Sequence, residues 1–258
     1  MQALADSGPS RERLRLLAGK NPLLTVENLR AGYGRMEILH GVDLMVAAGG
    51  SLCLIGPNGA GKSTVLHSIY GFTRILEGRI EVGGEDISRL SPNQKLKRAG
   101  VAYVLQDNSV FPDMTVEENL WMGGYLMERP EQAKEAAERV FAKYKRLADR
   151  RRQPARVLSG GERRLLEISR ALVMDPKVLL VDEPSIGLEP RYIDMVFEIL
   201  TALQREEGKS IVMVEQNAKK GLEFADVGYV LVAGNVARAG RGSELLEDPE
   251  VGRLFLGG

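Results

Sequence analysis

A glycine-rich loop that contains one lysine is the clearest chemical feature of the sequence. The stretch GPNGAGKST, residues 56–64, has the G-x-x-x-x-G-K-[ST] spacing of a phosphate-binding loop. Its glycines allow successive backbone N–H groups to converge on an anion, and the helix that follows adds the positive end of its dipole. We expect Lys62 to reach the β- and γ-phosphates and the Ser63 hydroxyl to ligate Mg²⁺. The alternative, a glycine-rich turn that binds nothing, does not explain the apolar strand before the loop and the periodic helix after it.

Two acids follow a second apolar strand. Val178–Val181 leads directly into Asp182 and Glu183. In a nucleotide-hydrolysing enzyme, the first acid would lie beside the metal of the nucleotide. The second is placed to polarise an attacking water. A strand that merely ends in exposed acids is the other reading, and the phosphate-binding loop in the same chain makes it the weaker one.

A further pair of glycines stands in the stretch LSGGE, residues 158–162. Ser159 and Glu162 fit an S-x-x-E capping box at the start of a helix. That box does not need Gly160 and Gly161, and two glycines leave the first amides of the helix open to an anion. One nucleotide does not need two such sites from one subunit. We therefore expect the second site to face the nucleotide of a neighbouring subunit in a head-to-tail dimer.

The elements that position these residues alternate between strands and helices. We expect an α/β fold with a P-loop NTPase core, a mainly parallel central sheet, an N-terminal antiparallel β region and an inserted helical subdomain. The insertion is predicted because Thr115–Val157 contains no strand-like run and has helical apolar spacing. A turn is expected over Arg30–Arg35. The expected strands are Leu23–Leu29, Val42–Val46, Leu52–Ile55, Gly78–Val82, Val101–Leu105, Val178–Val181, Ser210–Val214 and Val227–Val232.

Composition limits the classes of protein that remain. Lysine plus arginine equals aspartate plus glutamate, 35 each, so we expect no nucleic acid among the partners. No apolar run approaches the roughly 20 residues that span a bilayer, and Cys53 alone cannot form an internal disulfide. The 258 residues suit one large domain. We place it at 22–258, with a helical subdomain at about 112–160. Residues 1–21 are expected to be a polar leader, either frayed or with one amphipathic turn, that contributes little.

The three motifs together resemble the ATP-binding subunits of ABC transporters. GPNGAGKST, LSGGE and VLLVDEP occur in that order, and the resemblance covers nearly the whole chain from Leu23 onward. It implies that Tyr33 stacks on adenine and that Gln106 contacts Mg²⁺ and water and relays to the membrane partner. It also implies that Ser185–Glu189 crosses the interface of a dimer.

Finer features are similar to the smaller ATP-binding subunit of branched-chain amino acid importers. They are FPDMTVEENL (111–120), VEQNA (214–218) and the terminal FLGG (255–258). Urea and short-chain amide importers carry similar features and remain an alternative. The resemblance implies ATP and Mg²⁺ as cofactors, hydrolysis coupled to solute transport, two transmembrane permease subunits and an extracytoplasmic solute-binding protein. It also implies a peripheral location on the cytoplasmic face of the cell membrane.

Two residues depart from the general ABC pattern. Gln216 stands where a switch histidine is usual, and Glu189 stands where the interface loop usually has aspartate. Glutamine hydrogen-bonds but cannot carry a proton charge. In a sandwich dimer the switch acts on the nucleotide of its own chain, whereas the interface loop acts on that of the partner. A homodimer would combine both departures in every site, so we expect a heterodimer with a second, different ATP-binding subunit.

Two other classes of protein compete with the transporter. Soluble ABC ATPases of DNA repair or translation typically have two tandem cassettes or a long coiled-coil insertion, and this chain has neither. Small P-loop kinases and GTPases have no use for LSGGE. The predicted catalytic residues are Glu183, Lys62, Gln106 and Gln216, and the predicted metal ligands are Ser63, Gln106 and Asp182. The predicted nucleotide-binding residues are Tyr33, Gly56, Pro57, Asn58, Gly59, Ala60, Gly61, Lys62, Ser63, Thr64, Ser159, Gly160, Gly161 and Glu162.

Overall fold

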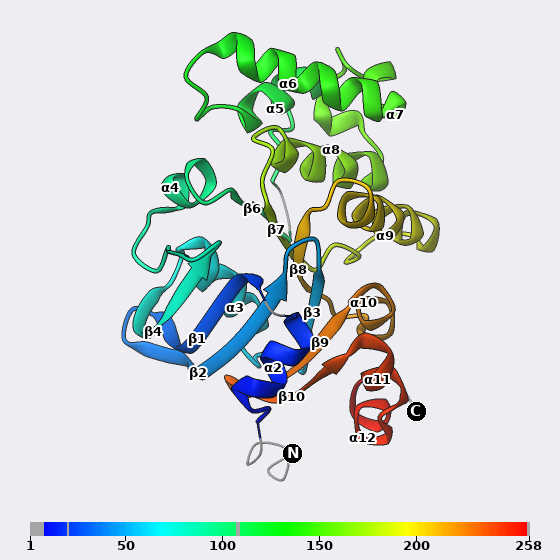
Figure 1. Ribbon diagram of the computed structural model, residues 1–258. Coiled ribbons are helices and arrows are strands. Elements are labelled where there is room, and N and C mark those ends of the chain that lie inside the picture. Colours follow the sequence, from blue (N-terminus) through cyan, green and yellow to red (C-terminus); the bar gives the residue numbers. More distant parts are fainter. Residues whose placement is uncertain (1–7, 20, 107–108, 257–258) are drawn as a thin grey trace.

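Two sheets form the centre of the computed structural model, which describes residues 8–19, 21–106 and 109–256 (Figure 1). The first sheet is antiparallel, with the strand order β2-β1-β4-β5. Its strands are β1 (Pro22–Tyr33), β2 (Met36–Ala47), β4 (Arg74–Val82) and β5 (Glu85–Asp86). The predicted N-terminal antiparallel region is confirmed.

The second sheet has six strands in the order β10-β9-β3-β8-β7-β6. The five strands from β9 to β6 run parallel, and β10 alone pairs antiparallel, with β9. All residues of β3, β7, β8 and β9 are buried, because helices cover both faces of the sheet. The mainly parallel central sheet is confirmed. Its strands are β3 (Ser51–Ile55), β6 (Val101–Val104), β7 (Val178–Asp182), β8 (Ser210–Val214), β9 (Val227–Val232) and β10 (Asn235–Arg241).

The helices separate into a group beside the sheets and a group at one end of the molecule. Helices α5, α6 and α7 lie at that end, and α8 lies between them and the parallel sheet (Figure 1). These four helices share an apolar core of their own, which includes Leu120, Phe141 and Leu166. The inserted helical subdomain of the predicted fold is therefore present. The helices are α2 (Arg11–Ala18), α3 (Lys62–Tyr70), α4 (Pro92–Lys97), α5 (Val116–Gly123), α6 (Pro130–Lys143), α7 (Lys145–Asp149), α8 (Gly160–Leu172), α9 (Pro190–Arg205), α10 (Ala218–Phe224), α11 (Gly242–Glu247) and α12 (Pro249–Val251), with η1 (Ala155–Val157) and η2 (Gly252–Leu256).

Two local predictions are wrong. The turn expected over Arg30–Arg35 is shorter, because β1 continues to Tyr33 and β2 begins at Met36. Residues before Pro22 do contribute to the fold, since α2 buries Leu14 completely against the sheets. Residues 1–7 and 20 of the predicted leader, and Gly257 and Gly258 of the terminal motif, lie outside the described residues.

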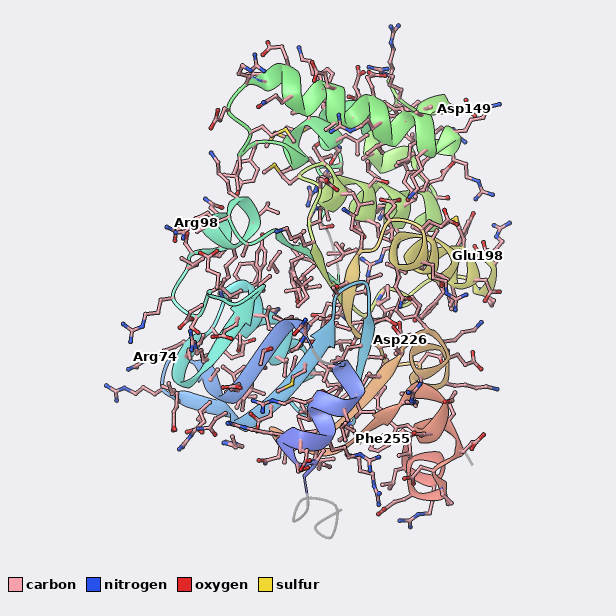
Figure 2. The ribbon with its side chains drawn as sticks, in the orientation of Figure 1. Arg74, Arg98, Asp149, Glu198, Asp226 and Phe255 are labelled. Carbon is pink, nitrogen blue, oxygen red and sulfur yellow. The ribbon has the colours of Figure 1, made fainter. Side chains whose placement is uncertain are left out.

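The start of β3 is tied to its surroundings by one carboxylate. Asp226, labelled in Figure 2, accepts hydrogen bonds from the Ser51 backbone N–H at 2.8 Å, the Ser51 hydroxyl at 3.0 Å and the Gln204 amide at 2.6 Å. This fixes the strand that delivers the glycine loop. Across the described ranges, no helix combines the length and apolarity that crossing a bilayer requires.

Candidate functional site

The glycine loop connects β3 to α3, and its backbone admits no side chain at two positions. Gly56 has φ 147°, and a Cβ there would lie 2.1 Å from the Leu231 carbonyl oxygen. Gly61 has φ 97°, and a Cβ there would lie 2.9 Å from Leu39 Cδ2. Both positions need glycine for conformation and for space. The loop therefore has the geometry that the sequence predicted.

Lys62 is enclosed by the loop that precedes it. The side chain is 6% exposed, and its Nζ donates hydrogen bonds to the carbonyl oxygens of Gly56 at 2.9 Å and Pro57 at 3.1 Å. Burial lowers the pKa of the ammonium, while the carboxylates of Glu183 and Asp182 act in the opposite direction. The cation is therefore held by the carbonyls of the loop and interacts electrostatically with the acids at the end of β7, Asp182 and Glu183.

Ser63 and Asp182 are neighbours, as the sequence predicted for two metal ligands. The Ser63 hydroxyl donates to Asp182 Oδ1 at 3.1 Å, and the Tyr103 hydroxyl donates to Oδ2 at 2.8 Å. Asp182 is 3% exposed, so these donors hold a carboxylate that water scarcely reaches. Nothing in the sequence indicated this role for Tyr103, because a tyrosine in a buried strand usually serves packing.

Gln106 and Glu183 also meet. Gln106 Nε2 donates to Glu183 Oε2 at 3.2 Å, and both residues line a cavity of about 500 Å³. Glu183 has φ 43°, which is uncommon for a residue other than glycine. Ile38 and Ile186 line the same cavity and were not predicted. The remaining lining residues are Asn58, Gly59, Gly61, Lys62, Ser63, Thr64 and Gln216.

Tyr33 does not line this cavity. The Tyr33 hydroxyl is 2.5 Å from His67 Nδ1, and Tyr33 is 43% exposed. Burial lowers the pKa of His67, which also contacts the rings of Phe72 and Tyr103 edge-on. The predicted role of Tyr33 in stacking on adenine stays a prediction. The sequence did not identify His67 as its partner.

The LSGGE segment lies away from the cavity lining, at the start of α8. The predicted capping box is confirmed, with Ser159 Oγ accepting from the Glu162 N–H at 3.3 Å and Glu162 Oε2 accepting from the Ser159 N–H at 2.9 Å. Gly161 has a packing reason that the sequence did not reveal, since a Cβ there would lie 2.1 Å from the Tyr192 ring. Gly160 is exposed, and the nearest atom to a Cβ there is 3.5 Å away. Of the two glycines, it is Gly160 that is left open towards solvent.

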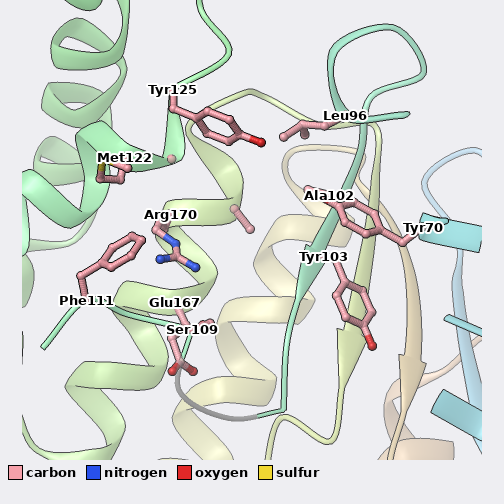
Figure 3. A pocket seen from close by; sticks show the side chains of 12 residues that line it. Tyr70, Leu96, Ala102, Tyr103, Ser109, Phe111, Met122, Tyr125, Glu167 and Arg170 are labelled. Atoms are coloured by element: carbon pink, nitrogen blue, oxygen red, sulfur yellow. The ribbon is translucent and has the colours of Figure 1, made fainter. Parts of the chain in front are cut away.

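A second cavity of about 330 Å³ lies between β6 and the helices α5 and α8 (Figure 3). Its lining includes the exposed side chains of Phe111, Met122 and Tyr125. Arg170 lies between Phe111 and Tyr125 in this view, with its guanidinium 5.4 Å from the Phe111 ring centroid. We call this cavity the groove. One of its lining residues, Ser109, follows Gln106 by three positions in the sequence.

Comparisons with known proteins agree with this geometry. The ABC transporter family matches residues 39–186, more than half of the 258 residues. The chain belongs to this family. It is 40% identical to the high-affinity branched-chain amino acid transport ATP-binding protein BraG of Pseudomonas aeruginosa, over 92% of this chain and 100% of BraG. It is 36% identical to the probable branched-chain amino acid transport ATP-binding protein LivF of Archaeoglobus fulgidus, over 91% of this chain and 99% of LivF.

Other members of the family are similar as well. The lipopolysaccharide export system ATP-binding protein LptB of Haemophilus influenzae is 34% identical over 91% of this chain and 97% of LptB. A solved ATP-binding cassette of an ABC transporter in its ADP conformation has a TM-score of 0.80 and 30% identity, over 92% of this chain and 99% of that cassette. The predicted fold and the resemblance to ABC ATP-binding subunits are confirmed. The chain is thus an ABC ATP-binding subunit that hydrolyses ATP.

The two departures from the general ABC pattern occupy different surroundings. Gln216 lines the 500 Å³ cavity together with Lys62 and Glu183. Glu189 is exposed at the start of α9, where its carboxylate is 3.1 Å from Arg191 Nε. The subunit therefore carries one departure in the cavity that Lys62 and Glu183 line and the other on its surface.

Proposed function

We propose that this chain is the energy-coupling ATPase of a membrane importer for branched-chain amino acids. The observation that carries the ATPase is the Gln106–Glu183 pair, which lines the same cavity as Lys62 and Ser63. BraG and LivF, named for branched-chain amino acid transport, support the solute class at 40% and 36% identity. The chain would work at the cytoplasmic face of the cell membrane, bound to its permease subunits.

In this proposal the residues of the cavity have separate roles in the transfer of the γ-phosphoryl group to water. The amides of the glycine loop and the Lys62 ammonium bind the phosphates of ATP. Glu183 accepts the proton of the attacking water, and Gln106 and Gln216 orient that water and the γ-phosphate. Such preorganised donors supply most of the barrier reduction, since little covalent chemistry is left to the protein.

Ser63 and Asp182 fit a magnesium ion. One hydroxyl and one carboxylate, 3.1 Å apart, are hard oxygen donors, and Mg²⁺ usually takes few protein ligands and completes its shell with phosphate oxygens and water. Within the described residues, no group of three His, Cys, Asp or Glu side chains is arranged for a metal. When bound, the ion neutralises the charge that develops on the phosphate oxygens.

Replacing Glu183 by glutamine tests the hydrolytic role. Glu183→Gln keeps the size and a hydrogen-bonding oxygen but removes the base, so turnover should fall by about 10²–10⁴-fold while ATP still binds. Lys62→Ala is the contrasting variant and should lose ATP affinity in a direct titration. Phosphate release by Glu183→Gln at the wild-type rate would show that another group acts as the base.

A different ATP-binding subunit is the partner we propose for the dimer. The reason is the pair of departures, Gln216 in the cavity and Glu189 on the surface loop. With an unlike partner of ordinary motifs, each composite site would contain only one departure. ATPase activity of the purified chain should then be low and should rise when the second subunit is added. A full rate with a second-order dependence on the chain's own concentration would instead indicate a homodimer.

The groove in Figure 3 is where we propose that a permease subunit docks. Its lining begins at Ser109, three residues after Gln106, and we expect Gln106 to report the docking to the nucleotide. Cys53 is fully buried, so an introduced cysteine is the sole accessible thiol in the described residues. Tyr125→Cys should cross-link to a permease subunit in membranes, whereas Leu76→Cys, exposed on β4, should not. Equal cross-linking at both positions would contradict the groove as the docking site.

The solute class is tested with the reconstituted transporter and its extracytoplasmic binding protein. ATP hydrolysis should be stimulated by leucine, isoleucine or valine, and labelled leucine should accumulate. Stimulation by urea or short-chain amides alone would assign the chain to those importers. Stimulation by neither solute class, with activity towards a lipopolysaccharide, would favour the role in the name of the LptB relatives.

A further inference from the structure

One buried guanidinium joins the two strands that carry the reacting residues. Arg164, on α8, is 4% exposed. Its Nη1 donates to the Leu105 carbonyl oxygen at 2.8 Å, its Nη2 to the Asp182 carbonyl oxygen at 3.1 Å and its Nε to the Pro184 carbonyl oxygen at 3.2 Å. Nη1 also donates to Glu167 Oε2 at 2.8 Å. A single side chain thus binds both segments that meet in the Gln106–Glu183 pair.

The three carbonyl oxygens are those that flank this pair. The Leu105 carbonyl belongs to the peptide that leads into Gln106, and those of Asp182 and Pro184 lie on either side of Glu183. Glu183 has φ 43°, a conformation that persists in such residues only when the surroundings determine it fully. The hydrogen bonds from Arg164 to the carbonyl oxygens of Asp182 and Pro184 fix the backbone on both sides of Glu183 and so help to hold its φ angle. The planar guanidinium fork is suited to the task, because its donors diverge at fixed angles.

The same residue connects the pair to the LSGGE segment. Arg164 is four residues after Gly160, about 6 Å along the axis of α8 at 1.5 Å per residue. Helix α8 packs against α5 and α7 of the helical subdomain on one side and against β6 and α9 on the other, so it joins the subdomain to the parallel sheet. A displacement of the start of α8 is therefore transmitted to the carbonyl oxygens around Glu183.

We propose that Arg164 is a positioning residue for hydrolysis, which holds Glu183 and Gln106 in register with helix α8. This inference rests on the proposed role of Glu183 as the base. Arg164 is neither among the residues that line the cavity nor part of the glycine loop, so we expect its effect to fall on turnover and not on ATP affinity. The ion pair with Glu167 keeps the guanidinium compensated in its buried position.

Arg164→Lys tests the inference in the 258-residue chain, co-purified with its partner subunits. Lysine keeps the charge that pairs with Glu167 but cannot span three carbonyls with one ammonium. We expect kcat to fall at least 10-fold while the dissociation constant for ATP stays within twofold. Arg163→Lys is the matched control, because Arg163 is the exposed neighbour on the same helix, and its kcat should stay within twofold of wild type.

A second variant tests whether a folding defect, and not the loss of positioning, explains a reduced kcat. Arg164→Met combined with Glu167→Met removes both charges together, and its thermal midpoint should stay near that of the wild type. It should show the same split, with kcat reduced and ATP affinity kept. Wild-type kcat in Arg164→Lys would overturn the inference, as would parallel losses of kcat, ATP affinity and thermal midpoint in both variants. Wild-type turnover in Glu183→Gln would refute a different claim, that Glu183 is the base. The two failures are distinguishable, because the turnover of the Arg164 variants is measured independently of Glu183→Gln.

Discussion

A fully buried lysine that contacts the C-terminal end of α3 leads to a prediction about how stability depends on pH. Lys95, on α4, donates from Nζ to the carbonyl oxygens of Ile69 at 2.7 Å and Ser68 at 3.3 Å. These carbonyls belong to the last turn of α3, where a helix leaves its acceptors unpaired and a cation is favourable. Burial lowers the pKa of Lys95 to about 8, although the carboxylate of Asp86 acts to raise it. The contact therefore stabilises the C-terminal end of α3, but it removes the Lys95 ammonium from water, which is unfavourable.

The sign of the pH effect follows from the two states. An unfolded chain titrates this lysine near 10.5, and the folded chain titrates it near 8. Between these values the unfolded state binds more protons, so the free energy of unfolding rises with pH. At about 1.36 kcal/mol for each tenfold change in proton affinity, the full penalty below pH 8 is about 3 kcal/mol. Between pH 7.5 and 9.5, about 2 kcal/mol of it is relieved.

Urea unfolding at pH 7.5 and 9.5, followed by circular dichroism, measures this change. Lys95→Met is the perturbation, and Lys97→Met on the same helix is the control because Lys97 is exposed. The wild type and Lys97→Met should each gain about 2 kcal/mol relative to Lys95→Met over this interval. Lys95→Met lacks the two hydrogen bonds to carbonyl oxygens at both pH values, so their contribution cancels. If wild type and Lys95→Met change in parallel, the burial argument is refuted.

Two further substitutions test the packing and the metal side of the site. Gly161→Ala brings a Cβ to 2.1 Å from the Tyr192 ring and should lower the free energy of unfolding by about 1–3 kcal/mol. Gly160→Ala is the control and should change this free energy far less. Urea titration measures both variants, and equal effects would contradict the packing role. Tyr103→Phe keeps the ring but removes the donor to Asp182, which is worth about 1 kcal/mol. The Mg²⁺ concentration for half-maximal ATPase should therefore rise several-fold, and an unchanged Mg²⁺ dependence would show that the hydroxyl has no such role.

The conformation of the glycine loop was predictable because its geometry is local. The glycines and Lys62 stand within nine consecutive residues, 56–64, and their backbone conformation is set by neighbours in the chain. Asp182 was predictable for a related reason. It ends a buried parallel strand, and the carboxyl ends of such strands meet at one edge of the sheet, where ligands bind in open α/β folds.

Contacts between distant segments were not predictable in the same way. Tyr103 reaches Asp182 across 79 positions of sequence, and Arg164 reaches Leu105 across 59. No pattern in the sequence separates these two residues from an ordinary core tyrosine or a solvated helical arginine. Their partners follow only from the order of the strands and from the way α8 lies on the sheet.

Gly161 shows how a correct pattern can rest on an incomplete reason. The sequence argument took both glycines of LSGGE as openings for an anion, since a capping box does not require them. The Tyr192 ring fills the space at Gly161, so close packing of α8 on α9 explains that glycine. The predicted anion site for a neighbouring nucleotide is therefore left to Gly160, where packing does not require a glycine.

The two departures from the ABC pattern are linked inside the chain by Glu215. Glu215 Oε1 accepts a hydrogen bond from the Ser185 hydroxyl and another from the Asn217 N–H, each at 2.8 Å, and the residue is 1% exposed. Ser185 opens the loop that ends at Glu189, and Gln216 lies between Glu215 and Asn217. If a partner subunit shifts this loop, we expect the displacement to reach Gln216 through Glu215. Glutamine cannot change its charge, so Gln216 would respond through its position and its hydrogen bonds alone.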